Sequence, residues 1–389
     1  MVTREGQVAA LLLVGFAAGA INTGTNLLFA ILGLITSLLV LEARRTRRAL
    51  RGLEAAREHP RAVVRGEPAR VTVGLRAADG ARRALPFLLE ERDPGRALDR
   101  TARVLLWEVG SEPARASWEA VFLRRGRVEL GALLVTCRGA CGLVEARREV
   151  AAEGAVLVLP RLRRLRATAT LLGPPSPAER RPRPLGPERR DVVRALRELR
   201  PGDDPRTIHW RATARRGELV VREFERAGPE GALVLLDLAG PTAPGVDGDP
   251  DPARQEAEAV QEAAVELALA LVGELLRRGE PAGLGLAGGG APLIVGPGGP
   301  GVLTRVREAL ALATPAPDPD LGGLLRAAGR QARDLRLILV TTRSAGEARA
   351  RLGGATPARL LEVHQEDDAE AWLVPLTATP DAPRAEEAT

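Results

Sequence analysis

Residues 194–226 read RALRELRPGDDPRTIHWRATARRGELVVREFER, the densest run of charged and reactive side chains in the chain. Pro201-Gly202 predicts a turn, because this dipeptide interrupts regular structure. Asp204-Pro205 predicts the start of a short helix, since Asp accepts the free backbone N–H groups and Pro suits the first helical position. Gly217 predicts the end of that helix, because glycine tolerates the left-handed cap.

The same stretch also places its arginines. Arg211 and Arg215 would lie one helical turn apart on one stripe. The β-favouring run Leu219–Phe224 then predicts a strand. From Arg200 to Phe224 the sequence therefore predicts a turn, a short helix and a strand. Together they are expected to form a structural unit whose exposed edge is also a docking surface.

Charge and cysteine content narrow the classes of partner. The chain of 389 residues has 56 basic and 50 acidic groups, with fourteen arginines against eight acidic residues between Arg180 and Arg226. This pattern favours a mixed, solvated surface with a local basic cluster over a nucleic-acid footprint. The two cysteines, Cys137 and Cys141, are too few for a disulfide framework and lack zinc-ligand spacing. They could pair in an oxidising compartment, but the pattern favours free thiols in a reducing one.

The N-terminus carries two apolar runs, Val8–Ile21 and Leu27–Leu41, around a polar turn at residues 22–26. A single helix over both runs would measure about 50 Å, too long for a bilayer core of about 30 Å. A transmembrane helical hairpin over residues 1–51 fits better than a signal peptide, because a second apolar segment follows at once. Arginines flank both outer ends, at positions 4, 44, 45, 47, 48 and 51, and predict that both ends are cytoplasmic.

The rest of the chain predicts two further domains. Short β-like runs separated by Gly, Pro and Asp turns predict a small β-sandwich-like domain over residues 52–160: Ala69–Leu75, Leu85–Glu90, Arg103–Val109, Ala116–Leu123, Val128–Thr136 and Ala155–Leu159. A Pro/Arg-rich linker over 161–190 follows. Strands alternating with helices then predict an α/β domain with a parallel sheet over 191–378, before a disordered tail at 379–389.

The expected α/β elements begin at strand Ala232–Leu236 and a helix that opens at Asp251-Pro252 and closes at Arg277-Arg278-Gly279. The others are strands Ala282–Leu286, Pro292–Val295, Leu335–Thr341 and Leu360–Val363, and helices Val302–Ala313 and Leu321–Arg330. Gly283–Gly288 spells G-x-G-x-x-G, but Gly289-Gly290-Ala291-Pro292 follows where a dinucleotide site needs a helix. No cofactor is expected there.

Several segments together resemble the bacterial membrane proteins called the Domain of Unknown Function 58 family. The resemblance is carried by Ala20–Gly24, Arg200–Arg206, Ile208–Trp210, Ala214-Arg215 and Arg222–Phe224, with lesser landmarks at Arg124–Val128 and Gly142-Leu143. It implies a von Willebrand factor A-like C-terminal domain and a multi-pass inner-membrane protein whose soluble domains face the cytoplasm. Family members are often encoded beside MoxR-type AAA+ ATPases, which implies a non-enzymatic interaction or adaptor protein for such an ATPase.

The residues expected to serve interaction or structure are those of the central motif: Arg200, Gly202, Asp203, Asp204, Arg206, His209, Trp210, Arg211, Arg215, Arg222 and Glu223. A phosphodiester hydrolase built on Asp203, Asp204 and His209 is one alternative, and a membrane-tethered nucleic-acid binder using the arginines is another. In a purely structural interpretation, Asp204 caps the helix and the arginines form ion pairs with Glu218, Glu223 and Glu225. One His and two adjacent Asp form a sparse constellation, so no catalytic residue is assigned.

Asp237 is the one candidate metal ligand. The von Willebrand factor A resemblance implies a loop Asp-x-Ser-x-Ser after the first strand, which chelates a divalent metal. Here Ala239 and Pro241 stand at the two serine positions, so two hydroxyl ligands are missing. No metal is therefore expected.

Overall fold

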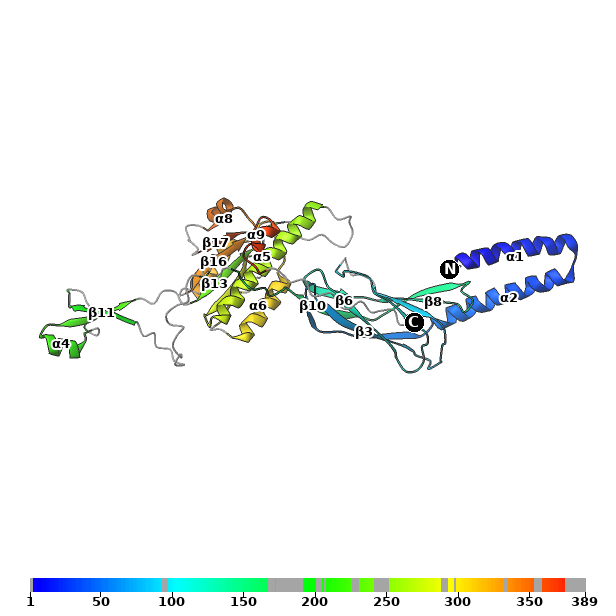
Figure 1. The fold of residues 1–389 in the computed structure, drawn as a ribbon, viewed down its shortest axis with the longest axis horizontal. Coiled ribbons are helices and arrows are strands. Elements are labelled where there is room, and N and C mark those ends of the chain that lie inside the picture. The colour runs from blue at the N-terminus through cyan, green and yellow to red at the C-terminus, as the bar shows by residue number, and fades with distance from the viewer. Residues whose placement is uncertain are drawn as a thin grey trace. The chain divides into compact units, whose positions relative to one another are not determined.

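A computed structural model describes residues 3–91, 97–166, 172, 192–200, 205, 208–225, 231–240, 252–287, 293–296, 299–331, 335–352 and 359–374. The chain divides into two compact units, one built chiefly from Met1–Arg161 and the other from Leu162–Ala243, Asp251–Ala309 and Thr314–Thr389. Figure 1 shows the order of the elements along the ribbon. The predicted tail at 379–389 and most of the predicted linker at 161–190 lie outside the described residues.

The first unit begins with the predicted pair of apolar helices, α1 (Arg4–Thr23) and α2 (Asn26–Ala49). They lie side by side in Figure 1 and contact each other. The side-chain oxygen of Thr3 caps α1 by accepting a hydrogen bond from the Gly6 N–H. The left-handed Gly24, with φ of 62°, ends it. By length and composition, both helices are able to cross a membrane.

The base of this helical pair is fixed to the turn at residues 139–143. The Thr3 hydroxyl donates to the carbonyl of Gly142 at 2.7 Å, and the Thr3 N–H donates to that of Leu143 at 3.1 Å. The buried Glu42 carboxylate of α2 accepts the Cys141 N–H at 2.9 Å. The turn that the sequence singles out at Gly142-Leu143 thus joins the helices to the β-rich region.

Among the described residues, ten strands form the β-rich remainder of this unit. They are β1 (Leu53–Glu58), β2 (Ala62–Val64), β3 (Pro68–Ala77), β4 (Phe87–Glu90), β5 (Arg103–Leu106), β6 (Ala114–Val121), β7 (Gly126–Leu130), β8 (Leu133–Arg138), β9 (Glu145–Val150) and β10 (Gly154–Leu159). Three sheets result, with orders β1-β3-β6, β2-β10-β7 and β5-β4-β8-β9. One core cluster joins β3 to β4 and β8 around Leu75, Phe87 and Leu133, and a second surrounds Phe122.

Two differences from the predicted strands have local causes. The single strand predicted over Val128–Thr136 is two strands, β7 and β8, because Gly131 interrupts the run. Strands β1, β2 and β9 were not predicted. Strand β2 has only three residues, and the β1 and β9 sequences LEAARE and EARREV carry charged side chains and alanine in place of the usual β-branched pattern.

The second unit contains a five-stranded sheet with the order β15-β14-β13-β16-β17. The strands are β13 (Ala232–Asp237), β14 (Ala282–Ala287), β15 (Leu293–Gly296), β16 (Arg336–Thr341) and β17 (Arg359–Glu362). All neighbours are parallel except β15, which is antiparallel to β14. The five residues between β14 and β15 are too few for a parallel crossover, which explains this exception to the predicted parallel sheet.

Helices cover the sheet on two faces. The long helix α5 (Pro252–Arg277) contacts β13, β14 and β16, and it confirms the predicted start and end of this helix. Leu233, Leu235 and Leu339 instead cluster with residues of α7 (Leu321–Gln331) and α8 (Ala345–Arg351). Successive side chains of a strand point to opposite faces of the sheet. Since helices cover both faces, every residue of β13 is buried. Two further helices of this region are α6 (Pro300–Leu312) and α9 (Glu366–Glu370).

The first two glycines of the G-x-G-x-x-G run have a packing role in β14. A Cβ at Gly283 would lie 2.6 Å from the carbonyl oxygen of Ile294 on the adjacent strand. A Cβ at Gly285 would lie 2.9 Å from side-chain carbons of Leu235 and Leu324. These glycines sit inside a strand, whereas a dinucleotide site needs them at the entry to a helix.

Candidate functional site

The central motif forms a strand, a short helix and a second strand. These are β11 (Val192–Glu198), α4 (Trp210–Arg216) and β12 (Val220–Glu225), and β11 pairs antiparallel with β12. The predicted strand is confirmed as β12 with its ends shifted by one residue. The predicted helix end is also confirmed, since Gly217 has φ of 75° and donates its N–H to Thr213. Strand β11 was not predicted, because arginines and Glu198 break its apolar pattern.

The predicted helix start at Pro205 is wrong. Helix α4 begins at Trp210, and the Nδ1 atom of His209 caps it by accepting the Ala212 N–H at 3.1 Å. Ile208 forms an isolated bridge with Val221, so the chain is still extended immediately before the helix. The cap that the sequence assigned to Asp204 is therefore supplied by an imidazole, and Asp204 itself lies outside the described residues.

Most motif side chains on α4 face solvent. Trp210 is 67% exposed. Arg211 and Arg215 are exposed, and neither pairs with a carboxylate in the part of the chain that the structure describes. The expected ion pair between these arginines and Glu218 is thus not formed.

The other motif residues are placed only in part. Arg200 is exposed just after β11, and Arg222 and Glu223 lie on β12 opposite Leu196 and Ala195. Gly202, Asp203, Asp204 and Arg206 lie outside the described residues. The predicted grouping of Asp203, Asp204 and His209 is therefore represented only by His209, whose Nδ1 serves the helix cap.

A second candidate site lies where β13 and β16 end side by side. Strand β13 is the first strand of this sheet in the chain; β14 pairs with it on one side and β16 on the other. Open α/β sheets bind ligands beyond the carboxyl ends of their strands at such a reversal of strand order. Asp237 and Thr341, the last residues of β13 and β16, are direct partners there.

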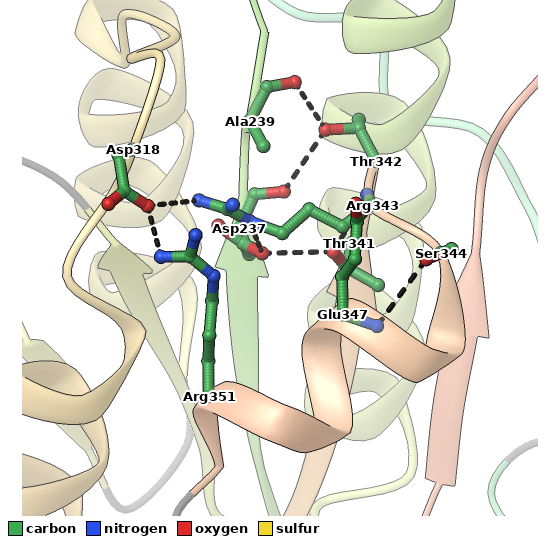
Figure 2. A network of polar contacts seen from close by, with 9 residues as sticks. All are labelled: Asp237, Ala239, Asp318, Thr341, Thr342, Arg343, Ser344, Glu347 and Arg351. Atoms are coloured by element: carbon green, nitrogen blue, oxygen red, sulfur yellow. Dashed lines mark hydrogen bonds and ion pairs between the residues drawn. The ribbon is translucent and has the colours of Figure 1, made fainter.

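Asp237 and Arg343 form a buried ion pair at this point, drawn in Figure 2. Oδ2 of Asp237 accepts hydrogen bonds from the Thr341 hydroxyl at 2.9 Å and from Nε of Arg343 at 3.0 Å. Asp237 has no exposed surface, and the Arg343 side chain is 8% exposed. Burial raises the pKa of the Asp237 carboxyl, while the Thr341 hydroxyl and the Arg343 guanidinium oppose that shift.

The network continues outward from Arg343. Its Nη2 group lies 3.1 Å from Oδ1 of Asp318, and Nη1 of Arg351 donates to the same oxygen. Asp318 belongs to the loop between α6 and α7. That loop is held across the end of the sheet, because the Gly240 N–H donates to the Ala316 carbonyl at 3.1 Å and the Ala316 N–H donates to the Leu238 carbonyl at 3.1 Å. Two arginines therefore converge on one oxygen of an exposed carboxylate.

The residues around Asp237 do not fit a divalent cation. A guanidinium already donates to Oδ2, and Ala239 offers no side-chain oxygen. The Thr342 hydroxyl donates to the Ala239 carbonyl at 2.7 Å, and Pro241 lies outside the described residues. Hard cations need a shell of six or more oxygen ligands, with few cationic neighbours. No group of three or more His, Cys, Asp or Glu side chains with metal-binding geometry occurs in the described ranges.

The sequence indicated Asp237 but missed its partners Thr341 and Arg343, and also missed Asp318 and Arg351, which extend the network from Arg343. One signal was available, because a polar Thr-Thr-Arg run at 341–343 follows at once on a strongly apolar strand. In an α/β sheet such a run lies where ligands bind. The pairing with Asp318 gave no local signal, since 25 residues separate Asp318 from Arg343.

Comparisons with known proteins agree with the motif resemblance. Residues 195–342 match the model of a family described as "Protein of unknown function DUF58", a segment that runs from β11 to Thr342. No curated protein sequence matches the chain.

Two solved structures share local similarity. A cohesin module from a family 33 glycoside hydrolase of Clostridium perfringens ATCC13124 is 14% identical, with 26% of this chain and 96% of that chain covered and a TM-score of 0.18. A beta-glucosidase from Listeria innocua is 15% identical, with 27% and 16% covered and a TM-score of 0.15. Both TM-scores are too low to indicate a shared overall fold.

Proposed function

We propose that this protein is a membrane-anchored, non-enzymatic adaptor that binds a protein partner, a MoxR-type AAA+ ATPase. The observation that carries the proposal is the exposed face of α4, where Arg211 and Arg215 stand one turn apart without a carboxylate partner among the described residues. The α4 segment lies inside the range that matches the DUF58 family model. Family members are often encoded beside such ATPases, which supports the identity of the partner.

The face of α4 has the chemistry of a docking surface. The αL cap at Gly217 and the His209 cap fix both ends of the helix, so the two guanidinium groups start from a constrained backbone. Arginine binds carboxylates through two parallel N–H groups, and a preorganised backbone lowers the entropy lost on binding. The exposed Trp210 adds the kind of large side chain that anchors protein interfaces. The partner surface should therefore be rich in carboxylates.

The proposed C-terminal domain is von Willebrand factor A-like. Asp237 ends the first strand of a sheet that helices cover on both faces, and this supports the resemblance. The proposed domain differs from the metal-binding pattern that the resemblance implies, because the Arg343 guanidinium contacts Asp237 where a cation would be expected. A boundary near residue 160 between the β-sandwich-like domain and the remainder is supported by the division of the chain at Arg161.

The proposed location is the bacterial inner membrane, with the soluble domains in the cytoplasm. Support comes from the two apolar helices and from the arginines that flank their outer ends. The turn between the helices has no positive charge, which favours its translocation. This arrangement would place α4 in the compartment where a cytoplasmic ATPase is found.

Co-purification from gently solubilised membranes tests the adaptor function. The full-length protein should capture ATPase subunits identified by mass, and the double variant Arg211→Ala with Arg215→Ala should lose most of them. Arg305→Ala removes an exposed arginine of α6 and is the matched control, with capture expected at the wild-type level.

Three outcomes would contradict the proposal. The first is equal capture by the wild type and the double variant. The second is cleavage of phosphodiesters by the purified protein, with His209→Ala removing that activity while the fold survives, which would support the hydrolase. The third is salt-dependent retention of nucleic acid in place of ATPase subunits, which would support the nucleic-acid binder.

A further inference from the structure

Asp318 is bound by two arginines through only one of its two oxygens. Nη2 of Arg343 and Nη1 of Arg351 both donate to Oδ1. Oδ2 of Asp318, Nη1 of Arg343 and Nη2 of Arg351 take part in no hydrogen bond within the described part of the chain. A carboxylate that used both oxygens against these guanidinium groups would make more charge-assisted hydrogen bonds than Asp318 does.

The inner arginine is held in place before any ligand arrives. Its Nε bonds to the buried Asp237, and its backbone N–H donates to the Thr341 hydroxyl at 3.0 Å. The Arg343 guanidinium therefore cannot swing away without leaving a buried carboxylate unpaired, which is costly. Such fixation lowers the conformational entropy that binding would otherwise remove.

The outer part of the network is accessible. The Asp318 side chain is 64% exposed and that of Arg351 is 42% exposed. Asp318 contacts Arg343 and Arg351 just beyond the carboxyl ends of β13 and β16, where α/β sheets bind their ligands. An incoming anion could thus reach the two guanidinium groups by displacing a single surface side chain.

We propose that Arg343 and Arg351 form a metal-independent site for a carboxylate of an acidic protein segment, and that Asp318 occupies this site as a built-in competitor. Arg343 supplies from within the chain the fixed positive charge for which a bound cation would otherwise be needed. The site is distinct from the α4 surface, so it deepens the proposed adaptor function by giving the partner a second acidic contact. It rests on that function only in taking a protein as the source of the carboxylate.

A peptide-binding measurement on the full-length protein in detergent micelles tests this site. The probe is a fluorescently labelled hexaglutamate peptide, followed by anisotropy at fixed low ionic strength, with a hexaglutamine peptide as the uncharged comparison. Asp318→Asn should tighten binding by about tenfold, because the competitor loses its charge. Asp320→Asn is the matched control, since Asp320 is a nearby exposed carboxylate that contacts neither arginine.

Two further arms separate this site from other basic surfaces. Arg351→Gln in the Asp318→Asn background should reverse the tenfold gain, whereas Arg305→Gln, which removes the same charge from α6, should leave it intact. The gain should also survive Arg211→Ala with Arg215→Ala, so failure of the α4 surface and failure of this site give different results. Free glutamate at equal carboxylate concentration should compete poorly, because a single small anion lacks the linked contacts of a segment.

The proposal is overturned if Asp318→Asn binds the peptide no more tightly than Asp320→Asn does, or if Arg351→Gln leaves the gain unchanged. Efficient competition by free glutamate would overturn the assignment to a protein segment. None of these variants removes Arg343 or Asp237, so the buried pair that supports the fold is kept throughout.

Discussion

Nε of Arg343 lies 3.0 Å from Oδ2 of Asp237. Asp237 is the last residue of β13, and Arg343 lies two residues beyond the end of β16, the adjacent parallel strand. Both side chains are buried, and Arg343 is the guanidinium that contacts Asp237, whereas Arg343 also contacts the exposed Asp318. A buried charge that loses its partner is strongly destabilising. The pair therefore couples the ends of β13 and β16.

Arg343→Ala should destabilise the α/β sheet by about 3–5 kcal/mol, because it leaves Asp237 buried without its counter-charge. Arg351→Ala should cost less than about 1 kcal/mol, since its pair with Asp318 is largely solvated. Hydrogen-exchange mass spectrometry of peptides that cover β13 and β16 measures the local opening free energy in this multidomain chain. Equal protection in the two variants would contradict the structural role of the buried pair.

The stability of the wild type relative to Asp237→Asn should increase as the pH falls. Burial raises the folded-state pKa of Asp237, so the folded protein binds this proton more tightly than the unfolded chain does. The contribution is fully present below the unfolded pKa of about 4 and is lost as pH rises through the folded pKa. Urea unfolding of both proteins across the acidic range measures the difference, in which titrating groups outside the Asp237 network cancel. A difference that decreases on acidification would contradict the raised pKa.

Millimolar Mg²⁺ or Mn²⁺ should leave the melting temperature of the full-length protein unchanged. A ligand that binds only the folded state raises stability by mass action, and the residues around Asp237 do not offer an oxygen shell for such an ion. Melting curves with each ion and with a chelator provide the measurement. An upward shift that Asp237→Asn abolishes would show that the guanidinium and a metal can exchange, contrary to this expectation.

A membrane-impermeant maleimide should label Cys141 in inverted membrane vesicles and leave it unlabelled in right-side-out vesicles. Cys141 is exposed, whereas Cys137 is buried and burial raises the pKa of the Cys137 thiol to about 11, which keeps it protonated and unreactive. Cys141→Ser should therefore abolish the labelling. Labelling confined to right-side-out vesicles would reverse the proposed orientation.

Gly283→Ala should destabilise the α/β sheet by about 1–3 kcal/mol through overpacking, because the new Cβ would meet the Ile294 carbonyl oxygen at 2.6 Å. Gly329→Ala in α7 is the matched control, since nothing lies within 4 Å of its Cβ position. That variant should be as stable as the wild type or slightly more so. Local opening free energies from hydrogen exchange compare the two. If Gly283→Ala left the local opening free energy at the wild-type value, this glycine would have no packing role.

Local signals in the sequence predicted a large share of the elements. Helix α5 was predicted with both its ends, because Asp251-Pro252 and Arg277-Arg278-Gly279 are start and stop signals that act within a few residues. The end of α4 at Gly217 was predicted for the same reason. Its start was not, because capping depends on backbone geometry before the helix, and the bridge between Ile208 and Val221 keeps the chain extended up to His209.

By itself, the sequence determined what depends on neighbouring residues or on bulk composition: two apolar helices with a polar turn, a β-rich region, an alternation of strands and helices, and Asp237 at the end of an apolar strand. Only the tertiary structure decided what faces Asp237. Parallel pairing of β13 with β16 brings Arg343 to Asp237 across 106 positions, and the loop after α6 adds Asp318. Sheet pairing depends on the packing of distant apolar faces, so the charge that neutralises a buried carboxylate is fixed by the fold and carries no signature in the residues around it.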